Sequence, residues 1–103
     1  MPKIKIKPLS VNECWQGRRF KTPKYKSYEI ELLYLLPKLK LSPPYNINIT
    51  FGISALSDID NPIKPFLDIL QKKYQINDRD VMRLCINKVI TKDHFIEFEI
   101  CTM

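Results

Sequence analysis

The chain has 103 residues, of which 45% are hydrophobic and 27% charged, with a net charge of +6. These values are typical of one soluble globular domain, because two domains sharing this length would each be too small to close a core. No apolar run approaches the ~18 residues that a membrane span needs, and the first residues lack the continuous apolar stretch of a secretory signal. We therefore expect a single cytoplasmic domain over residues 1–103, without membrane attachment.

The positive charge is concentrated near the amino terminus. Residues 1–28 carry eight lysines and arginines and a single acid, Glu13, whereas the rest of the chain carries nine basic and ten acidic residues. Such a local field attracts a polyanion, because each phosphate that it neutralises releases condensed counterions. The alternative is a row of solvated lysines that keeps an edge strand from pairing. We favour nucleic acid as the partner.

The first half of the chain predicts a strand, a loop and a helix. Residues 3–7 alternate lysine with isoleucine, which indicates a strand with one apolar and one basic face. Residues 8–24 are rich in turn-forming and basic residues and indicate a loop. Residues 25–36 place apolar side chains at helical spacing, and Pro37 should end that helix.

The second half adds a strand, a helix and two more strands. Residues 45–51 alternate most regularly, and residues 61–74 show the spacing of an amphipathic helix, with Asp60 or Asn61 expected as its cap. Residues 81–90 and 94–101 should form a closing hairpin. The order β-α-β-α-β-β predicts an α+β fold, in which two helices pack on one face of a small mixed sheet. A homodimer would bury what such a half-covered sheet exposes.

Asp58 and Asp60 are the first candidates for chemistry. They follow the regular strand and are two residues apart, a spacing that puts both carboxylates on one side of an extended chain. Mg²⁺ prefers oxygen ligands and keeps several waters, so a few carboxylates and a substrate phosphate complete its site.

The alternative is that the pair are turn and helix-capping residues, which are common at helix starts, and capping explains one of the two acids well. Capping alone explains both acids less well in a protein that binds nucleic acid. Two carboxylates beside phosphate are unfavourable unless a cation lies between them. A calcium loop of the EF-hand type is rejected, because Lys64 and Ile69 stand where glycine and glutamate are required.

A longer pattern surrounds the acidic pair. Asp58-Ile-Asp60-Asn61 is followed by Lys64, Asp68 and Leu70, and then by Asn77-Asp78 with Val81. This run resembles the signature of the RusA family of Holliday-junction resolvases. Ser10-Val11-Asn12 with Trp15 resembles the amino-terminal segment of that family, so the resemblance covers about residues 9–100.

The resemblance implies a dimeric, metal-dependent endonuclease that resolves four-way DNA junctions in recombination and repair. It implies Mg²⁺, or alternatively Mn²⁺, held by Asp58, Asp60 and Asp78, and Lys64 as an essential basic group. Asp80 competes with Asp78 as the third acid, and we favour Asp78 for its distance before Val81. The residues expected to support this site without holding the metal are Asn61, Asp68 and Asp80. Resolvases of this kind are often carried by bacteria, phages and prophages.

Lys64 could neutralise charge on the phosphate, or it could form a surface pair with Asp68 four residues later. Trp15 could equally stack on a base or belong to the core. The other candidates for DNA contact are Asn12, Arg18, Arg19, Lys21, Lys24 and Lys26.

The remaining reactive side chains are expected to be structural. Cys14, Cys85 and Cys101 are an odd set without paired spacing, and we interpret them as packing residues rather than disulfides or zinc ligands. His94 is expected to be solvated or structural. A non-catalytic module that binds branched DNA is the second functional hypothesis, and a basic protein that binds an acidic partner protein is the third.

Overall fold

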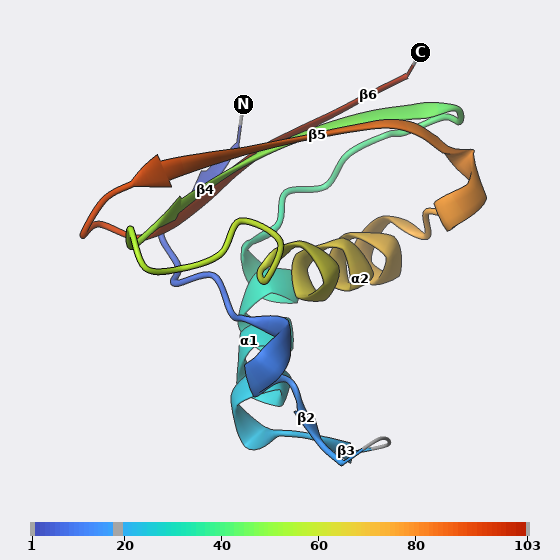
Figure 1. The fold of residues 1–103 in the computed structure, drawn as a ribbon. Coiled ribbons are helices and arrows are strands. Elements are labelled where there is room, and N and C mark those ends of the chain that lie inside the picture. Colours follow the sequence, from blue (N-terminus) through green and yellow to red (C-terminus); the bar gives the residue numbers. More distant parts are fainter. Residues whose placement is uncertain (1, 18–19, 103) are drawn as a thin grey trace.

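The computed structural model describes residues 2–17 and 20–102 and has an α+β fold (Figure 1). Its elements are the strands β1 (Lys3–Ile4), β2 (Trp15–Gln16), β3 (Phe20–Lys21), β4 (Tyr45–Ile53), β5 (Val81–Ile90) and β6 (Phe95–Thr102), the helices α1 (Pro23–Leu35) and α2 (Ile63–Tyr74), and the short 3-10 turns η1 (Val11–Glu13) and η2 (Asp78–Asp80). The main sheet has the order β1-β6-β4-β5, and β2 and β3 form a small separate hairpin. The expected α+β class with a mixed sheet is confirmed.

The two carboxyl-terminal strands do not form the hairpin expected from the sequence. β4 lies between them, parallel to β5 and antiparallel to β6. The segment β4-α2-β5 is therefore a parallel crossover, and the chain then passes over the end of β4 to place β6 on its other side. The short connection over residues 91–93 suggested a hairpin, but β4 offers both of its edges and its alternating apolar face to the two strands.

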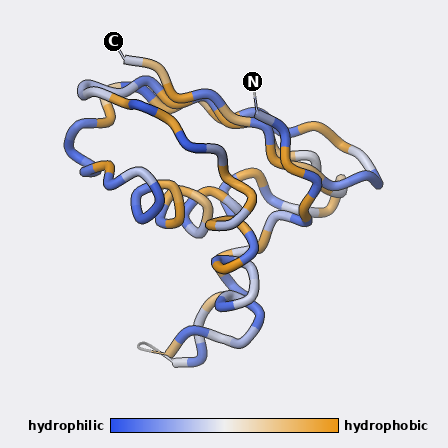
Figure 2. Tube along the Cα trace, turned by 180° about the vertical axis from the view of Figure 1, so that it is seen from behind, coloured by the Kyte–Doolittle hydropathy of each residue, from blue (hydrophilic) through white to orange (hydrophobic). Residues whose placement is uncertain are grey.

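Both helices lie on the same side of the main sheet (Figure 1). α2 covers the sheet with Phe66, Ile69 and Leu70, which are fully buried. The Phe66 ring meets Phe51 of β4 and Phe98 of β6 edge-on, with ring centroids 6.0 and 5.7 Å apart. Figure 2 shows hydrophilic and hydrophobic residues interspersed along the strands and α2, as expected of elements that bury only one face.

Several element boundaries differ from the sequence expectations for local reasons. The first strand ends at Ile4, because β6 begins at Phe95 and the chain soon runs past the end of its partner. α1 begins at Pro23, two residues early, because the Thr22 hydroxyl accepts a hydrogen bond from the Tyr25 amide at 3.1 Å. The expected loop over residues 8–24 contains η1 and the β2–β3 hairpin.

Neither helix in the described part of the chain has the length and apolar character needed to cross a bilayer. The three cysteines are free. Burial and the nearby carboxylates of Glu13 and Asp68 raise the pKa of the Cys14 thiol to about 11. Cys14 therefore stays protonated at neutral pH, in keeping with the packing role expected of it.

Glu29 joins α1 to two other elements through ion pairs. Its carboxylate accepts hydrogen bonds from Lys72 of α2 at 2.8 Å and from Lys21 of β3 at 2.9 Å. Burial alone would raise the pKa of Glu29, but these two ammonium groups bring it below its ordinary value of 4.5. The folded state therefore favours the ionised form of Glu29, and this stabilisation is lost as the pH falls through the lowered pKa.

We predict that Glu29→Gln lowers the free energy of unfolding at pH 7 by about 1 kcal/mol, because two charge-assisted hydrogen bonds are weakened. The gap between the parent and the variant should close as the pH falls from 4.5 through the lower pKa of folded Glu29. Thermal unfolding of both proteins at pH 7 and at about pH 3 measures this. Glu31→Gln, at an exposed position on the same helix, is the control. A gap that stays constant with pH would contradict the assignment.

Candidate metal and DNA-binding site

Asp58 and Asp60 lie in a loop, residues 54–62, that connects β4 to α2. Backbone turns shape this loop: the Asn61 amide donates to the Asp58 carbonyl oxygen and the Ile63 amide donates to the Asp60 carbonyl oxygen, each at 3.3 Å. Both side chains are exposed. Within residues 2–17 and 20–102, neither carboxylate takes part in a hydrogen bond or an ion pair.

The structure corrects the expected cap of α2. The cap position is Pro62 and no side chain caps the helix, so neither Asp60 nor Asn61 has that role. The two backbone turns described above occupy Asp60 and Asn61, so these residues lie before the cap position of the helix, which begins at Ile63. Capping by the acidic pair is therefore excluded by the geometry, whereas the turn role considered for Asp58 and Asp60 is present in their backbone.

Neighbouring elements hold the loop in place. The Lys88 ammonium group of β5 donates to the carbonyl oxygens of Ala55 and Ser57. On the other side, the Val11 amide of η1 donates to the Asn61 carbonyl oxygen at 2.9 Å. The acidic pair thus stands on a loop that is tied both to the sheet and to the amino-terminal segment.

Sequence reasoning missed Lys88, although a signal was present. Leu84, Ile86 and Ile90 share one face of β5 because they are opposite Ile47, Ile49 and Ile53 of β4. Lys88 occupies that same face, opposite Phe51. A lone lysine in an apolar alternation indicates a polar partner beneath it, which here is the backbone of the acidic loop.

Asp78 does not join the other two acids within one chain. It begins η2, beyond the end of α2, whereas Asp58 and Asp60 precede its start. A helix of 12 residues is ~18 Å long. The described ranges contain no group of three His, Cys, Asp or Glu side chains able to hold a metal ion. The expected three-carboxylate set is thus not assembled in the single chain.

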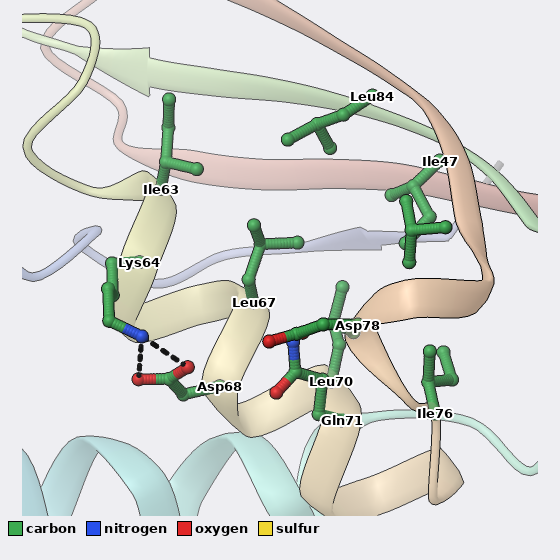
Figure 3. Close-up of a pocket in the computed structure, with 11 residues that line it drawn as sticks. Ile47, Ile63, Lys64, Leu67, Asp68, Leu70, Gln71, Ile76, Asp78 and Leu84 are labelled. Atoms are coloured by element: carbon green, nitrogen blue, oxygen red, sulfur yellow. Dashed lines mark hydrogen bonds and ion pairs between the residues drawn. The ribbon is translucent and has the colours of Figure 1, made fainter.

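Asp78 lines a cleft of about 440 Å³ between α2 and β5 (Figure 3). Apolar side chains line both sides of the cleft, among them Leu67 of α2 and Leu84 of β5, and the polar Gln71 and Asp78 line it as well. Asp80 is half-buried and does not line the cleft. Of the two rival acids, Asp78 is therefore the one that faces an open space.

Lys64 also lines this cleft, and it pairs with Asp68 at 3.0 and 3.2 Å (Figure 3). The pair spans one helical turn and its lysine is exposed, so it contributes only about 0.3 to 0.5 kcal/mol to stability. The surface pair considered from the sequence is present. Lys64 is the second residue of α2, so it lies close in the chain to the acidic loop.

The expected DNA contacts of the amino-terminal quarter have different surroundings. Lys21 and Lys24 form ion pairs with Glu29 and Glu13, each at 2.9 Å, which partly neutralise their charge. Lys26 is exposed on α1, and Asn12 is exposed in η1. Arg18 and Arg19 lie outside the described residues.

Trp15 does not belong to the hydrophobic core, so the core role considered for it is wrong, and base stacking stays a prediction. Its ring meets Tyr25 edge-on at a centroid distance of 5.8 Å, yet the residue is 43% exposed. One part of the indole therefore packs against α1, and another part can meet a ligand.

Comparison of the chain with protein-family models and with curated proteins finds no match.

We predict that Lys88→Met loosens the acidic loop, because the carbonyl oxygens of Ala55 and Ser57 lose their charged donor. The free energy of unfolding should fall by about 1 to 2 kcal/mol, and amide hydrogen exchange should quicken in residues 54–61 more than in β4. Lys40→Met, at an exposed position, is the matched control. An unchanged exchange rate in the loop would show that Lys88 does not hold it.

Proposed function

We propose that this protein is a divalent-metal-dependent DNA endonuclease. The observation that supports this most directly is the pair of exposed carboxylates, Asp58 and Asp60, on an anchored loop, where neither side chain has a hydrogen bond or ion pair with another described residue. Exposed carboxylates without structural partners fit a hard cation such as Mg²⁺ or Mn²⁺. The net charge of +6 favours a polyanionic substrate.

More particularly, we propose that the substrate is a four-way DNA junction, as the resemblance to RusA resolvases implies. When bound, the metal would activate water and offset charge on the scissile phosphate. Asp58 and Asp60 would hold it, and Lys64 at the start of α2 would contact the same phosphate by turning away from Asp68. Exposed lysines and the open part of Trp15 would position the DNA around this point.

A homodimer would supply the third acid that the single chain does not bring to Asp58 and Asp60. β5 is an edge strand of the sheet, and it exposes Met82, Leu84, Val89 and Ile90. An exposed apolar edge favours pairing with another strand, and a twofold arrangement would pair β5 with its own copy in antiparallel orientation. The start of one β5 would then lie beside the end of the other.

This arrangement would carry Asp78 of one chain towards the acidic loop of the second. Asp78 is three residues before β5, and Ile90 at the end of β5 pairs with Ile53, from which the acidic loop begins. A register centred on Ile86 would place Met82 opposite the partner's Ile90, so that two strongly exposed apolar side chains meet. Symmetry would create two such sites, in keeping with paired cuts in a four-way junction.

We expect Asp58→Asn to lower the rate of junction cleavage in Mg²⁺ at least about a hundredfold while junction binding stays within about threefold. The reason is that the metal loses a ligand whereas the basic contacts to phosphate remain. Cleavage and gel-shift assays on a synthetic four-way junction measure the two effects. Glu31→Gln removes an equal charge from exposed α1 and should cut normally. Full activity in Asp58→Asn, Asp60→Asn and Asp78→Asn would refute the site.

The second candidate function, a non-catalytic module for branched DNA, is favoured by the absence of a complete three-acid cluster in the described part of a single chain. It predicts junction binding without cleavage in Mg²⁺ or Mn²⁺. The same assay on the parent protein decides between the two functions.

The proposed dimer is tested by charge reversal across β5. Met82→Glu with Ile90→Glu would place like charges opposite each other and should yield a monomer of 12.2 kDa without cleavage activity. Met82→Lys with Ile90→Glu would place opposite charges there and should restore a particle of twice that mass. Sedimentation equilibrium of the parent and both variants measures the mass. An active parent that stays monomeric at micromolar concentration would contradict this interface.

A further inference from the structure

Three segments that are far apart in the sequence meet at one end of the main sheet (Figure 1). They are the chain just after β1, the turn between β5 and β6, and the start of the acidic loop. Lys3 of β1 and Lys5 and Lys7 from the first segment line a common hollow with Lys92 and His94 from the second. We call these five residues the sheet-end basic surface.

The four lysines of this surface direct their charge to solvent. All four are exposed, while Ile4 between them is buried and Ile6 is half-buried, so the period-two alternation persists beyond β1. In the described ranges, none of these four ammonium groups belongs to an ion pair, in contrast to Lys21 and Lys24. Asp93 is the one acid that lines the same hollow.

Local packing orders part of the surface. The Lys3 ammonium lies 4.3 Å from the centre of the Phe95 ring, and that ring lies so close over Gly52 that a Cβ there would meet it at 2.3 Å. The His94 Nδ1 atom is 3.2 Å from the Gly52 carbonyl oxygen. β1, the turn and β4 are therefore held together beneath the lysines.

The sheet-end basic surface is continuous with the acidic loop. Lys92 and His94 line a second hollow together with Ser54 and Ala55, the first residues of that loop. The Thr91 amide also donates to the Ile53 carbonyl oxygen at 3.0 Å, which fixes the turn beside the start of the loop. A strand of nucleic acid that crosses one hollow would thus meet the other.

We propose that the sheet-end basic surface binds the DNA backbone next to the phosphate that is presented to Asp58 and Asp60. This inference rests on the proposed function and adds a contact surface separate from the basic residues 18–26. Several uncompensated ammonium groups on an ordered surface that leads to two carboxylates match a run of phosphates, of which one is held through a cation. Its contacts are to phosphate, so it holds DNA without reading sequence.

The test compares two double variants that remove the same charge. Lys5→Gln with Lys92→Gln removes two ammonium groups from the surface, whereas Lys38→Gln with Lys40→Gln removes two exposed lysines from the segment between α1 and β4. Binding to a synthetic four-way junction is measured without metal from about 50 to 200 mM salt. The slope of log K against log salt is negative, and the first variant should reduce its magnitude by about 1 to 2, since each lost phosphate contact reduces it by about 0.9. The control should keep the parent slope.

Equal slopes for the two double variants would overturn the basic surface. If the parent still cuts the junction in that case, the proposed nuclease function stands without it. A reduced slope for Lys5→Gln with Lys92→Gln, combined with no cleavage by the parent in Mg²⁺ or Mn²⁺, would support the surface and remove the nuclease. A parent that binds no DNA at 50 mM salt would overturn both proposals. Unfolding temperatures within a degree or two of the parent would confirm that the exposed substitutions leave the fold intact.

Discussion

The contact of Phe66 with Phe51 and Phe98 determines where α2 lies. These three rings belong to α2, β4 and β6, all are fully buried, and each contact is edge-on. Edge-to-face aromatic pairs add about 0.5 to 1.5 kcal/mol beyond the burial of their area. Because Phe66 stands near the start of α2, this contact also places the acidic loop over the end of β4. The far end of the helix then carries Asp78 away from it.

The same placement leaves β5 poorly covered. α2 packs over β4 and β6, so Leu84 and Ile90 keep 41% and 67% exposure although they share the inner face of the sheet. The apolar cleft between α2 and β5 is the result. A surface of this kind on an edge strand is typical of an interface. The separation of Asp78 from Asp58 and Asp60 and the exposed edge of β5 thus have the same structural origin. A second copy of the chain paired at β5 would bring the acids together and cover the edge.

Regular periodicity made β4 and α2 predictable, because each buries one face and its apolar residues repeat at the matching interval. The pairing order was not predictable in the same way: the short turn after β5 favours a hairpin, and only the two free edges of β4 explain why the strands separate. The early start of α1 had a local signal, Thr22 before Pro23. The distance from Asp58 to Asp78 depends on the path of α2 over the sheet, which spacing along the chain does not reveal.

The position of β6 in the sheet has a consequence for how the protein folds during its synthesis. β6 stands between β1 and β4, and it supplies Ile96, Phe98 and Ile100 to the core. β1, which is made first, therefore has no neighbour in the sheet until residues 95–97 have left the ribosome. Phe66 likewise lacks one of its two aromatic partners until then. Until β6 has been made, β1 and Phe66 lack the partner that covers them, so substitutions in β6 should affect the yield of folded protein more than equal losses of area elsewhere.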